Sequence, residues 1–337
     1  FSDALSGSVL GVLLFVSSLT MFMSGLVANF EFDLKKIIAL STLSQLGLMM
    51  SILSLGESML AFFHLLMHAL FKALLFMCAG CIIHNMNNCQ DIRYMGSLML
   101  FIPLTSSFFN ICNLSLCGLP FLSGFYSKDL ILEFMSMGYM NFYIYFIFYM
   151  STGLTVMYSV RLLYYTMLGD YSGLPNFSIT DLGASMLKGM GGLIFLVIFG
   201  GSTVSWLVFP TPYFICLPFL MKIMVVLTIL FGVWLGYLIS SVGFNDYSKT
   251  LSFYKLSFFL SSMWNLSYLS SFGTIYYFLS FGEKLNSLVD QGWSEYYGSQ
   301  NMFLTIKSGA SFLHKIFLNN IKIFLTLFLI WVCLLFF

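Results

Sequence analysis

Residues 63–76, FHLLMHALFKALLF, place His64, His68 and Lys72 inside an otherwise apolar stretch. On an α-helix each four-residue step advances by about 400°, so the three side chains are expected to form one polar stripe along a single helix. A charged side chain near the middle of a bilayer costs at least about 2.5–3.5 kcal/mol, so the stripe should face protein or water. The stretch therefore predicts a membrane-spanning helix with a functional polar face. Neutral, hydrogen-bonded packing stays an alternative for both histidines.

The composition is that of an integral membrane protein. Of the 337 residues, 59% are hydrophobic and 8% are charged, and the mean hydropathy is +0.93. Soluble domains carry roughly 25% charged residues, so this chain lies far outside their range. A net charge of +1 gives no electrostatic reason to expect a nucleic acid partner.

We predict an all-α polytopic membrane protein with about eight transmembrane helices, because uncharged runs long enough to cross a bilayer recur along the chain. One of these helices is expected to be discontinuous, at about 103–137. Residues 256–282 lack charge but are rich in Ser and Asn, which favours an interfacial or partly buried segment over a span. Residues 321–337 are expected to form a final anchoring span.

A long amphipathic helix is expected from Phe281 to Asn320. Charged residues alternate there with apolar residues that recur every three or four positions, which is typical of a helix lying on a membrane surface or on neighbouring subunits. Gly298 and Gly309 are the two points at which this helix could be interrupted.

The discontinuity is predicted from Gly118, Pro120 and Gly124, which precede Lys128 and Asp129. Proline removes a backbone donor and the glycines permit non-helical turns, so backbone groups at membrane depth need water or polar side chains as partners. Transporters use such broken helices to build ion sites. An ordinary kink near the membrane edge is the alternative.

Together these groups suggest a row of titratable side chains, His64, His68 and Lys72 on one helix and Lys128 with Asp129 on a broken neighbour, along which protons could hop. Lys35 lies near hydroxyl and amide side chains in the preceding span. It is either part of this row or an ordinary lysine that extends to the membrane interface.

Three motifs, 32–49 (FDLKKIIALSTLSQLGLM), 63–76 and 119–129 (LPFLSGFYSKD), resemble in this order the antiporter-like family of membrane subunits, and within it the chain 5 family of respiratory complex I. The resemblance covers nearly the whole chain. It implies that Lys72 is a central channel lysine, that Lys128 is the lysine of the discontinuous helix near the exit, and that His64 and His68 connect them. It also strengthens the case for Lys35 as a proton-transfer residue, whereas Asp129 is a candidate from its position next to Lys128 at the break.

The resemblance further implies a division of the chain. It assigns the C-terminal half of an antiporter-like proton channel to 1–168, additional transmembrane helices to 169–255, an interfacial segment with a lateral helix to 256–320 and a terminal anchor to 321–337. The family's N-terminal half, with its own broken helix, is absent here. The chain is therefore expected to be part of a longer protein, and the residues of the first half of the path cannot be named.

No redox cofactor or metal is expected in this chain, because it contains no GxGxxG motif, P-loop or cluster of metal ligands. The CxxC formed by Cys78 and Cys81 lacks a second ligand pair, so packing is the favoured interpretation. By resemblance, NADH, FMN, iron–sulfur clusters and ubiquinone are expected in partner subunits.

The resemblance places the chain in the mitochondrial inner membrane. It implies other membrane subunits as partners, especially the sister antiporter-like subunits 4 and 2 under the lateral helix, and lipids such as cardiolipin. Proton translocation driven by NADH oxidation is the leading function. A subunit of a related multisubunit cation/proton exchanger and a purely structural membrane subunit are the alternatives.

Overall fold

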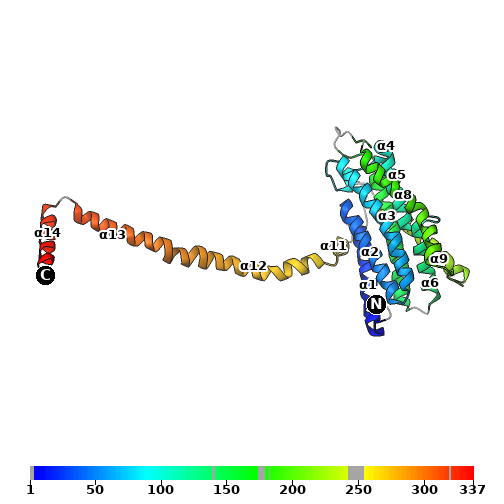
Figure 1. Cartoon of the computed structure of the whole chain (residues 1–337), viewed down its shortest axis with the longest axis horizontal. Helices are drawn as coiled ribbons and strands as arrows, with labels where there is room; N and C mark the ends of the chain where they lie inside the picture. The colour runs from blue at the N-terminus through cyan, green and yellow to red at the C-terminus, as the bar shows by residue number, and fades with distance from the viewer. Residues whose placement is uncertain (1–3, 139–140, 174–178, 182, 242–253, 319) are drawn as a thin grey trace. The chain divides into compact units, whose positions relative to one another are not determined.

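The computed structural model describes residues 4–138, 141–173, 179–181, 183–241, 254–318 and 320–337. The described part is helical and contains no strand; Asp33 and Asp91 form an isolated antiparallel bridge between two connections. The chain divides into two compact units, Phe1–Trp264 and Asn265–Phe337. In Figure 1 the helices of the first unit, coloured from blue to yellow-green, lie side by side as a bundle.

Within the described residues, six helices are long and apolar enough to cross a membrane. At about 1.5 Å per residue, 20 residues cover the hydrocarbon core of about 30 Å. The six are α1 (Gly7–Ala28), α2 (Leu34–Ser54), α3 (Ser58–Asn85), α7 (Phe142–Leu163, continuing as a π-helical turn to Leu168), α8 (Ala184–Val208) and α9 (Phe219–Ser240).

The predicted discontinuity is a real break between two helices. After the short η2 (Ile92–Tyr94) and α4 (Leu98–Phe101), α5 runs over Pro103–Cys117 and α6 over Ser123–Met137. Gly118 ends α5 with φ +84°, a left-handed conformation that glycine adopts without steric cost.

The six long helices become up to seven spans if Tyr268–Phe317 and α14 (Ile321–Phe336), which meet at a sharp bend, count as one. The predicted total of about eight would also need the broken α5–α6 pair to cross, and that total stays a prediction. Counted by length and apolarity alone, α5, α6 and α14 fall short, because they contain 15, 15 and 16 residues. The prolines of the 210–218 segment lie between α8 and α9, where the chain cannot continue a helix.

The bundle packs its polar side chains inward as well as its apolar ones. The helix α3 contacts α2, α5, α6 and α8, and α7 contacts α1, α5 and α9. Buried apolar side chains of α2, α3 and α5, such as Ile38, Phe71 and Phe109, form one continuous core. Buried hydroxyls return hydrogen bonds to carbonyls three or four residues earlier in their own helices, which satisfies them without water.

The second unit contains a helix that is longer than predicted. The helix runs without interruption over Tyr268–Phe317, through α12 (Gly273–Leu285), α13 (Asn301–Phe317) and π-helical stretches between and before them. Part of the predicted interfacial segment 256–282 therefore belongs to this helix, and α11 (Tyr254–Ser261) accounts for another part. The expected start at Phe281 was wrong. Gly298 and Gly309 do not interrupt the helix.

The boundary between the two compact units, at Trp264 and Asn265, falls inside the predicted 256–320 domain. The other predicted boundaries, at 168 and 320, stay predictions.

Gly309 offers a test of the long helix. A Cβ added there meets no atom within 4 Å, whereas a Cβ at Gly292 would lie 3.0 Å from the carbonyl oxygen of Ser287. Gly309→Ala should stabilise the helix by about 0.5–1 kcal/mol, because alanine loses less backbone entropy. Hydrogen–deuterium exchange of amides 301–317 should slow in detergent. Gly292→Ala should give a smaller gain, and faster exchange in Gly309→Ala would contradict this description.

Candidate functional site

The stripe on α3 lies inside the bundle. His64, His68 and Lys72 are 1%, 8% and 4% exposed. Other apolar residues of the same stretch, such as Leu65 and Phe76, are exposed on the other side of α3 and suited to lipid. The sequence places these polar groups on one helix face by their four-residue spacing, and packing against α2 and α6 closes that face from lipid.

Lys72 is held by a hydroxyl of the neighbouring helix. Its ammonium nitrogen Nζ donates a hydrogen bond to Oγ of Ser41 on α2, and Ser41 in turn donates to the carbonyl oxygen of Ile38 at 2.7 Å. Burying a charged group costs free energy unless an opposite charge lies beside it. The hydroxyl of Ser41 is neutral, so it stabilises the charged form of Lys72 only weakly. Lys72 is thus in a position to lose its proton when the charges around it change.

His64 joins three helices. Its Nδ1 lies 2.9 Å from Oγ of Ser127 on α6, and its Nε2 lies 3.3 Å from Oε1 of Gln45 on α2. A carboxamide oxygen can only accept, so this arrangement requires a proton on Nε2 and leaves Nδ1 to accept the hydroxyl proton of Ser127. A neutral histidine bonded in this way has one donor and one acceptor, the property that a proton relay needs.

His68 lies between His64 and Lys72 on α3. Its ring centroid is 6.3 Å from that of His64, and the edge of its ring packs against Phe71. Its Nε2 is buried and has no hydrogen-bond partner among the described residues. A buried ring nitrogen without a partner costs about 1–3 kcal/mol, so it is available to a proton or a water molecule passing along α3.

The break between α5 and α6 holds Lys128. The side chain is 4% exposed, and Nζ donates to Oγ1 of Thr155 on α7 at 2.8 Å and to the carbonyl oxygen of Leu116 at 3.4 Å. Leu116 lies in the last turn of α5, where carbonyls lack partners within the helix and the helix dipole is negative. The broken helix therefore supplies the acceptor that the ammonium group needs.

Each lysine lies within electrostatic range of one histidine. His64 interacts electrostatically with His68 and with Lys128, and His68 interacts with Lys72. The structure thus brings together four of the six predicted site residues in one buried row. The row runs from Lys72 through His68 and His64 to Lys128.

The remaining two predicted residues lie outside this row. Asp129 is half-buried on α6, and its charged neighbours are Glu133 and Lys222. Lys35 is exposed in the first turn of α2. The structure places neither in contact with the four buried groups, and their roles in proton transfer stay predictions.

Among the described residues, no carboxylate pairs with either buried lysine. In the parts of the chain that the structure describes, the ion pairs are Lys36 with Asp33 at 2.9 Å and Arg93 with Asp91 at 2.6 Å. Both pairs lie near the helix ends, and the hydrogen bond from Arg93 holds the pKa of Asp91 below its ordinary value. The interior row therefore holds two cations among neutral groups.

Sequence reasoning missed the contribution of α7. Its inner face carries buried hydroxyl groups at 151, 152, 155, 158 and 159, one of which is the Lys128 partner Thr155. These positions follow helical spacing inside an apolar run, a signal similar to that of the α3 stripe. The predicted site rested on ionisable residues and on the hydroxyls near Lys35, so it did not include α7.

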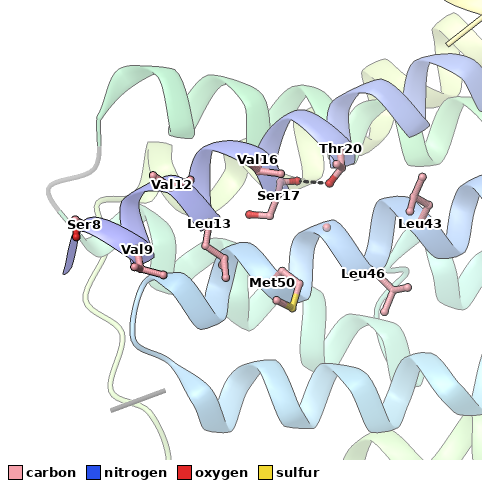
Figure 2. A pocket seen from close by; sticks show the side chains of 11 residues that line it. Ser8, Val9, Val12, Leu13, Val16, Ser17, Thr20, Leu43, Leu46 and Met50 are labelled. Carbon is pink, nitrogen blue, oxygen red and sulfur yellow. Dashed lines mark hydrogen bonds between the residues drawn. The ribbon is translucent and has the colours of Figure 1, made fainter. Parts of the chain in front are cut away.

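Two other features lie apart from the row. An apolar groove of about 700 Å³ opens between α1 and α2, lined by side chains such as Val12, Leu46 and Met50 (Figure 2). It contains no titratable group and therefore has no chemistry of its own.

Cys78 is buried, and its thiol donates a hydrogen bond to Sδ of Met190 at 3.6 Å, as expected for a packing residue.

Comparison with known proteins defines the class. Residues 2–155, which contain the whole row, match the family described as "NADH:quinone oxidoreductase/Mrp antiporter, TM". Two solved structures share the fold: the membrane-bound sulfane sulfur reductase, an archaeal respiratory membrane complex (TM-score 0.51, 20% identity, covering 69% of this chain and 45% of that one), and the Mrp complex from Dietzia sp. (TM-score 0.52, 18% identity, 69% and 49%). The chain is a multi-pass membrane protein of the antiporter-like class.

Within that class, residues 158–337 match the family described as "NADH dehydrogenase subunit 5 C-terminus", and the chain belongs to this family. It is 54% identical to NADH-ubiquinone oxidoreductase chain 5 of Aedes aegypti over 99% of its length, and 51% identical to that of Locusta migratoria over 96%. It spans 58% and 57% of the lengths of these two relatives.

Proposed function

We propose that this chain forms the outer half of a proton path in chain 5 of NADH:ubiquinone oxidoreductase. The observation that carries the proposal is the buried row from Lys72 to Lys128. Every group in it can bind a proton, and neither lysine has an acid partner within the part of the chain that the structure describes. Membership of the subunit 5 family and the names of the relatives support the assignment to that enzyme.

In the proposed mechanism, protonated Lys72 gives a proton toward His68, and His64 passes one on. For a proton moving toward Lys128, Nε2 of His64 takes it up on the side away from Ser127, and Nδ1 gives its proton to Oγ of Ser127. The ring must change tautomer between transfers. Ser127, which is bonded to His64 and adjacent to Lys128 on α6, links the histidine to the lysine of the broken helix.

Changes of charge drive the transfers. An additional cation near Lys72 raises the free energy of its charged form and promotes release of the proton, whereas an approaching carboxylate has the opposite effect.

The energy would come from electron transfer in partner subunits, which would hold NADH, FMN, the iron–sulfur clusters and ubiquinone. Asp129 and Glu133 would receive the proton beyond Lys128, and Lys35 would act near the other end of α2.

The long helix would join this chain to its partners. Its apolar side chains, among them Leu288 and Trp293, are 62% and 59% exposed, so they offer surface to neighbouring subunits. We assign the sister antiporter-like subunits 4 and 2 to this surface, with lipids such as cardiolipin at the bundle, in the mitochondrial inner membrane.

One observation favours a second candidate function, a subunit of a cation/proton exchanger, because the family that matches 2–155 includes Mrp antiporters. Proton transport by membrane vesicles that contain the complete protein in its complex distinguishes the two candidate functions. We expect NADH-driven acidification that persists when sodium is replaced by choline and stops with a rotenone-type inhibitor. Transport that requires sodium and ignores the inhibitor would favour the exchanger.

A further inference from the structure

Gln45 is a buried amide that carries no proton in the proposed path. It lies on α2 and is 2% exposed, and its Oε1 lies 3.3 Å from Nε2 of His64. An amide side chain presents an acceptor oxygen and a donor NH2 group at the same end. Rotation by half a turn about its last bond exchanges the two. Gln45 can therefore face Nε2 with either an acceptor or a donor.

The hydroxyl of Ser127 offers a similar choice on the other side of the ring. Its Oγ lies 2.9 Å from Nδ1 of His64 and 3.3 Å from the carbonyl oxygen of Gly124 in its own helix. A hydroxyl carries one proton, so Ser127 donates either to Nδ1 or to Gly124. When it donates to Gly124, its oxygen is free to accept a hydrogen bond from a proton on Nδ1.

These contacts support two complete hydrogen-bonding arrangements around His64. In the first, Nε2–H donates to Oε1 of Gln45, and the hydroxyl of Ser127 donates to Nδ1. In the second, the NH2 group of Gln45 donates to Nε2, Nδ1–H donates to Oγ of Ser127, and Ser127 donates to the carbonyl oxygen of Gly124. Both ring nitrogens are bonded in both arrangements, so neither tautomer leaves a buried polar atom of the ring unpaired.

We propose that Gln45 is a positioning residue whose amide rotates with the tautomer of His64; this inference rests on the proposed function. Before a transfer, the ring proton is on Nδ1 and the NH2 group of Gln45 faces Nε2. The amide turns as a proton arrives on Nε2. Nδ1 then gives its proton to Oγ of Ser127, which passes its own hydroxyl proton on.

The ring gains one proton and loses one, so it ends neutral in the form that the structure shows, with Nε2–H bonded to Oε1 of Gln45. Before the next transfer the ring has to regain the Nδ1–H form. When the amide turns back, its NH2 group gives Nε2 of that form a hydrogen bond. Gln45 thus supports both tautomers that the relay needs, without taking up a proton itself.

The length of the contact suits this rotation. Hydrogen bonds from N–H to oxygen are mostly about 2.7–3.2 Å long, and the bond between Gln45 and His64 lies just beyond that range at 3.3 Å. Little is lost when the amide turns. A carboxylate in its place could only accept and would hold the proton on Nε2, whereas an apolar side chain would bond to neither tautomer.

Gln45→Met in the complete protein within its assembled complex is the first test. Methionine is unbranched and fills a similar space, but it offers Nε2 neither a donor nor an acceptor of comparable strength. We expect NADH-driven proton translocation to fall about tenfold, because one ring nitrogen of the relay loses its hydrogen bond in each cycle. Complex abundance on native gels should stay the same. Normal translocation by Gln45→Met would overturn the inference.

Gln45→Glu is the second test, and its pH profile gives a readout that a merely structural role would not move. The ionised carboxylate accepts only, so translocation should be slow at high pH. As the pH is lowered, the introduced carboxyl takes up a proton and regains a donor beside its acceptor, and translocation should recover relative to the unmodified protein. A negative charge alone would slow Gln45→Glu and spare Gln45→Met, so losses in both variants identify the exchange of donor and acceptor.

The other titratable groups near this contact are the same in every variant. His68 on α3 and Lys128 on α6 interact electrostatically with His64, and Tyr158 on α7 lies within interaction range of Gln45. Their titration should affect Gln45→Met and Gln45→Glu alike. Parallel pH profiles of these two variants would therefore contradict the proposed rotation, and this comparison decides the question from Gln45→Glu and the unmodified protein if Gln45→Met fails to assemble.

Ser51→Ala is the matched control on the same helix. Ser51 is fully buried on α2, and its hydroxyl donates to the carbonyl oxygen of Leu48 at 2.7 Å, within its own helix. Its removal takes a buried polar group from α2 without touching His64. Translocation and its pH profile should be normal. A loss equal to that of Gln45→Met would show that any polar deletion on α2 disturbs transport, and would overturn the role of Gln45.

Lys72→Met, measured in parallel, separates this inference from the function on which it rests. Loss of translocation in Lys72→Met together with normal translocation in Gln45→Met would remove only the role of Gln45. Normal translocation in Lys72→Met would remove the proposed path as well.

Discussion

Lys72→Met is expected to lower NADH-driven proton translocation by about a hundredfold or more, because it removes a group that must take up and release the proton. Methionine is unbranched and apolar and can fill the space of the lysine stem, so α3 should stay packed. The hydrogen bond to Ser41 is lost, but Ser41 keeps its bond to Ile38. Reconstituted vesicles with a pH-sensitive dye provide the measurement.

Lys188→Met is the control for this prediction. Lys188 is exposed on α8 and has no part in the row, so its removal should leave translocation unchanged. The amount of assembled complex and its NADH oxidation with an artificial electron acceptor report whether the electron-transfer part stays intact. Full translocation by Lys72→Met at normal complex levels would refute the role assigned to Lys72.

Gly124→Ala is expected to prevent stable packing of the broken helix. A Cβ at this position would lie 1.8 Å from the carbonyl oxygen of Ser115, a backbone atom that cannot move aside as a flexible side chain can. The start of α6 would have to separate from the end of α5. Such overpacking costs about 3 kcal/mol, a large share of the stability of a domain, so little complex should assemble.

The separation should also disturb Lys128, because the Leu116 carbonyl that accepts its hydrogen bond belongs to the displaced end of α5. Gly80→Ala provides the matched control on α3, since an added Cβ there meets nothing within 4 Å. It should be neutral or stabilise the helix by about 0.5–1 kcal/mol. Thermal unfolding in detergent and native gels measure both variants, and equal stability of the two would contradict the close approach at Gly124.

The sequence was sufficient to predict the helices, the break and the α3 stripe, because each depends on local chemistry. The four-residue spacing of His64, His68 and Lys72 fixes their common face, and Pro120 with its flanking glycines forbids a continuous helix. The position of Lys128 beside the break was predicted in the same way, and the structure adds that it is buried and bonded to the carbonyl oxygen of Leu116. The free carbonyls of the preceding helix attract a cation.

The partners of these groups could not be predicted, because they come from other helices. Ser127 and Thr155 meet the row only through the rotation of α6 and α7 about their axes, which depends on tertiary packing. The exposed position of Lys35 depends in the same way on which side of α2 faces α3. Its sequence neighbourhood, rich in hydroxyls, gave no information about that rotation.

The long helix shows a different limitation. Its start was predicted at Phe281, where charged residues begin, but the backbone is helical from Tyr268. A charge pattern marks an amphipathic surface, whereas helix formation requires only residues that tolerate the backbone geometry. The apolar residues before Phe281 satisfy that requirement without adding to the pattern.

Proton translocation by Lys72→Met, Lys128→Met and the double variant, each in the complete protein within its complex, tests the central claim most directly. If both lysines act in series on one buried path, each single variant should lose translocation and the double variant should lose no more, because one interruption already blocks the path. Full translocation by either single variant would contradict a single path through Lys72 and Lys128. So would partial losses of the translocation rate in the single variants that multiply in the double variant.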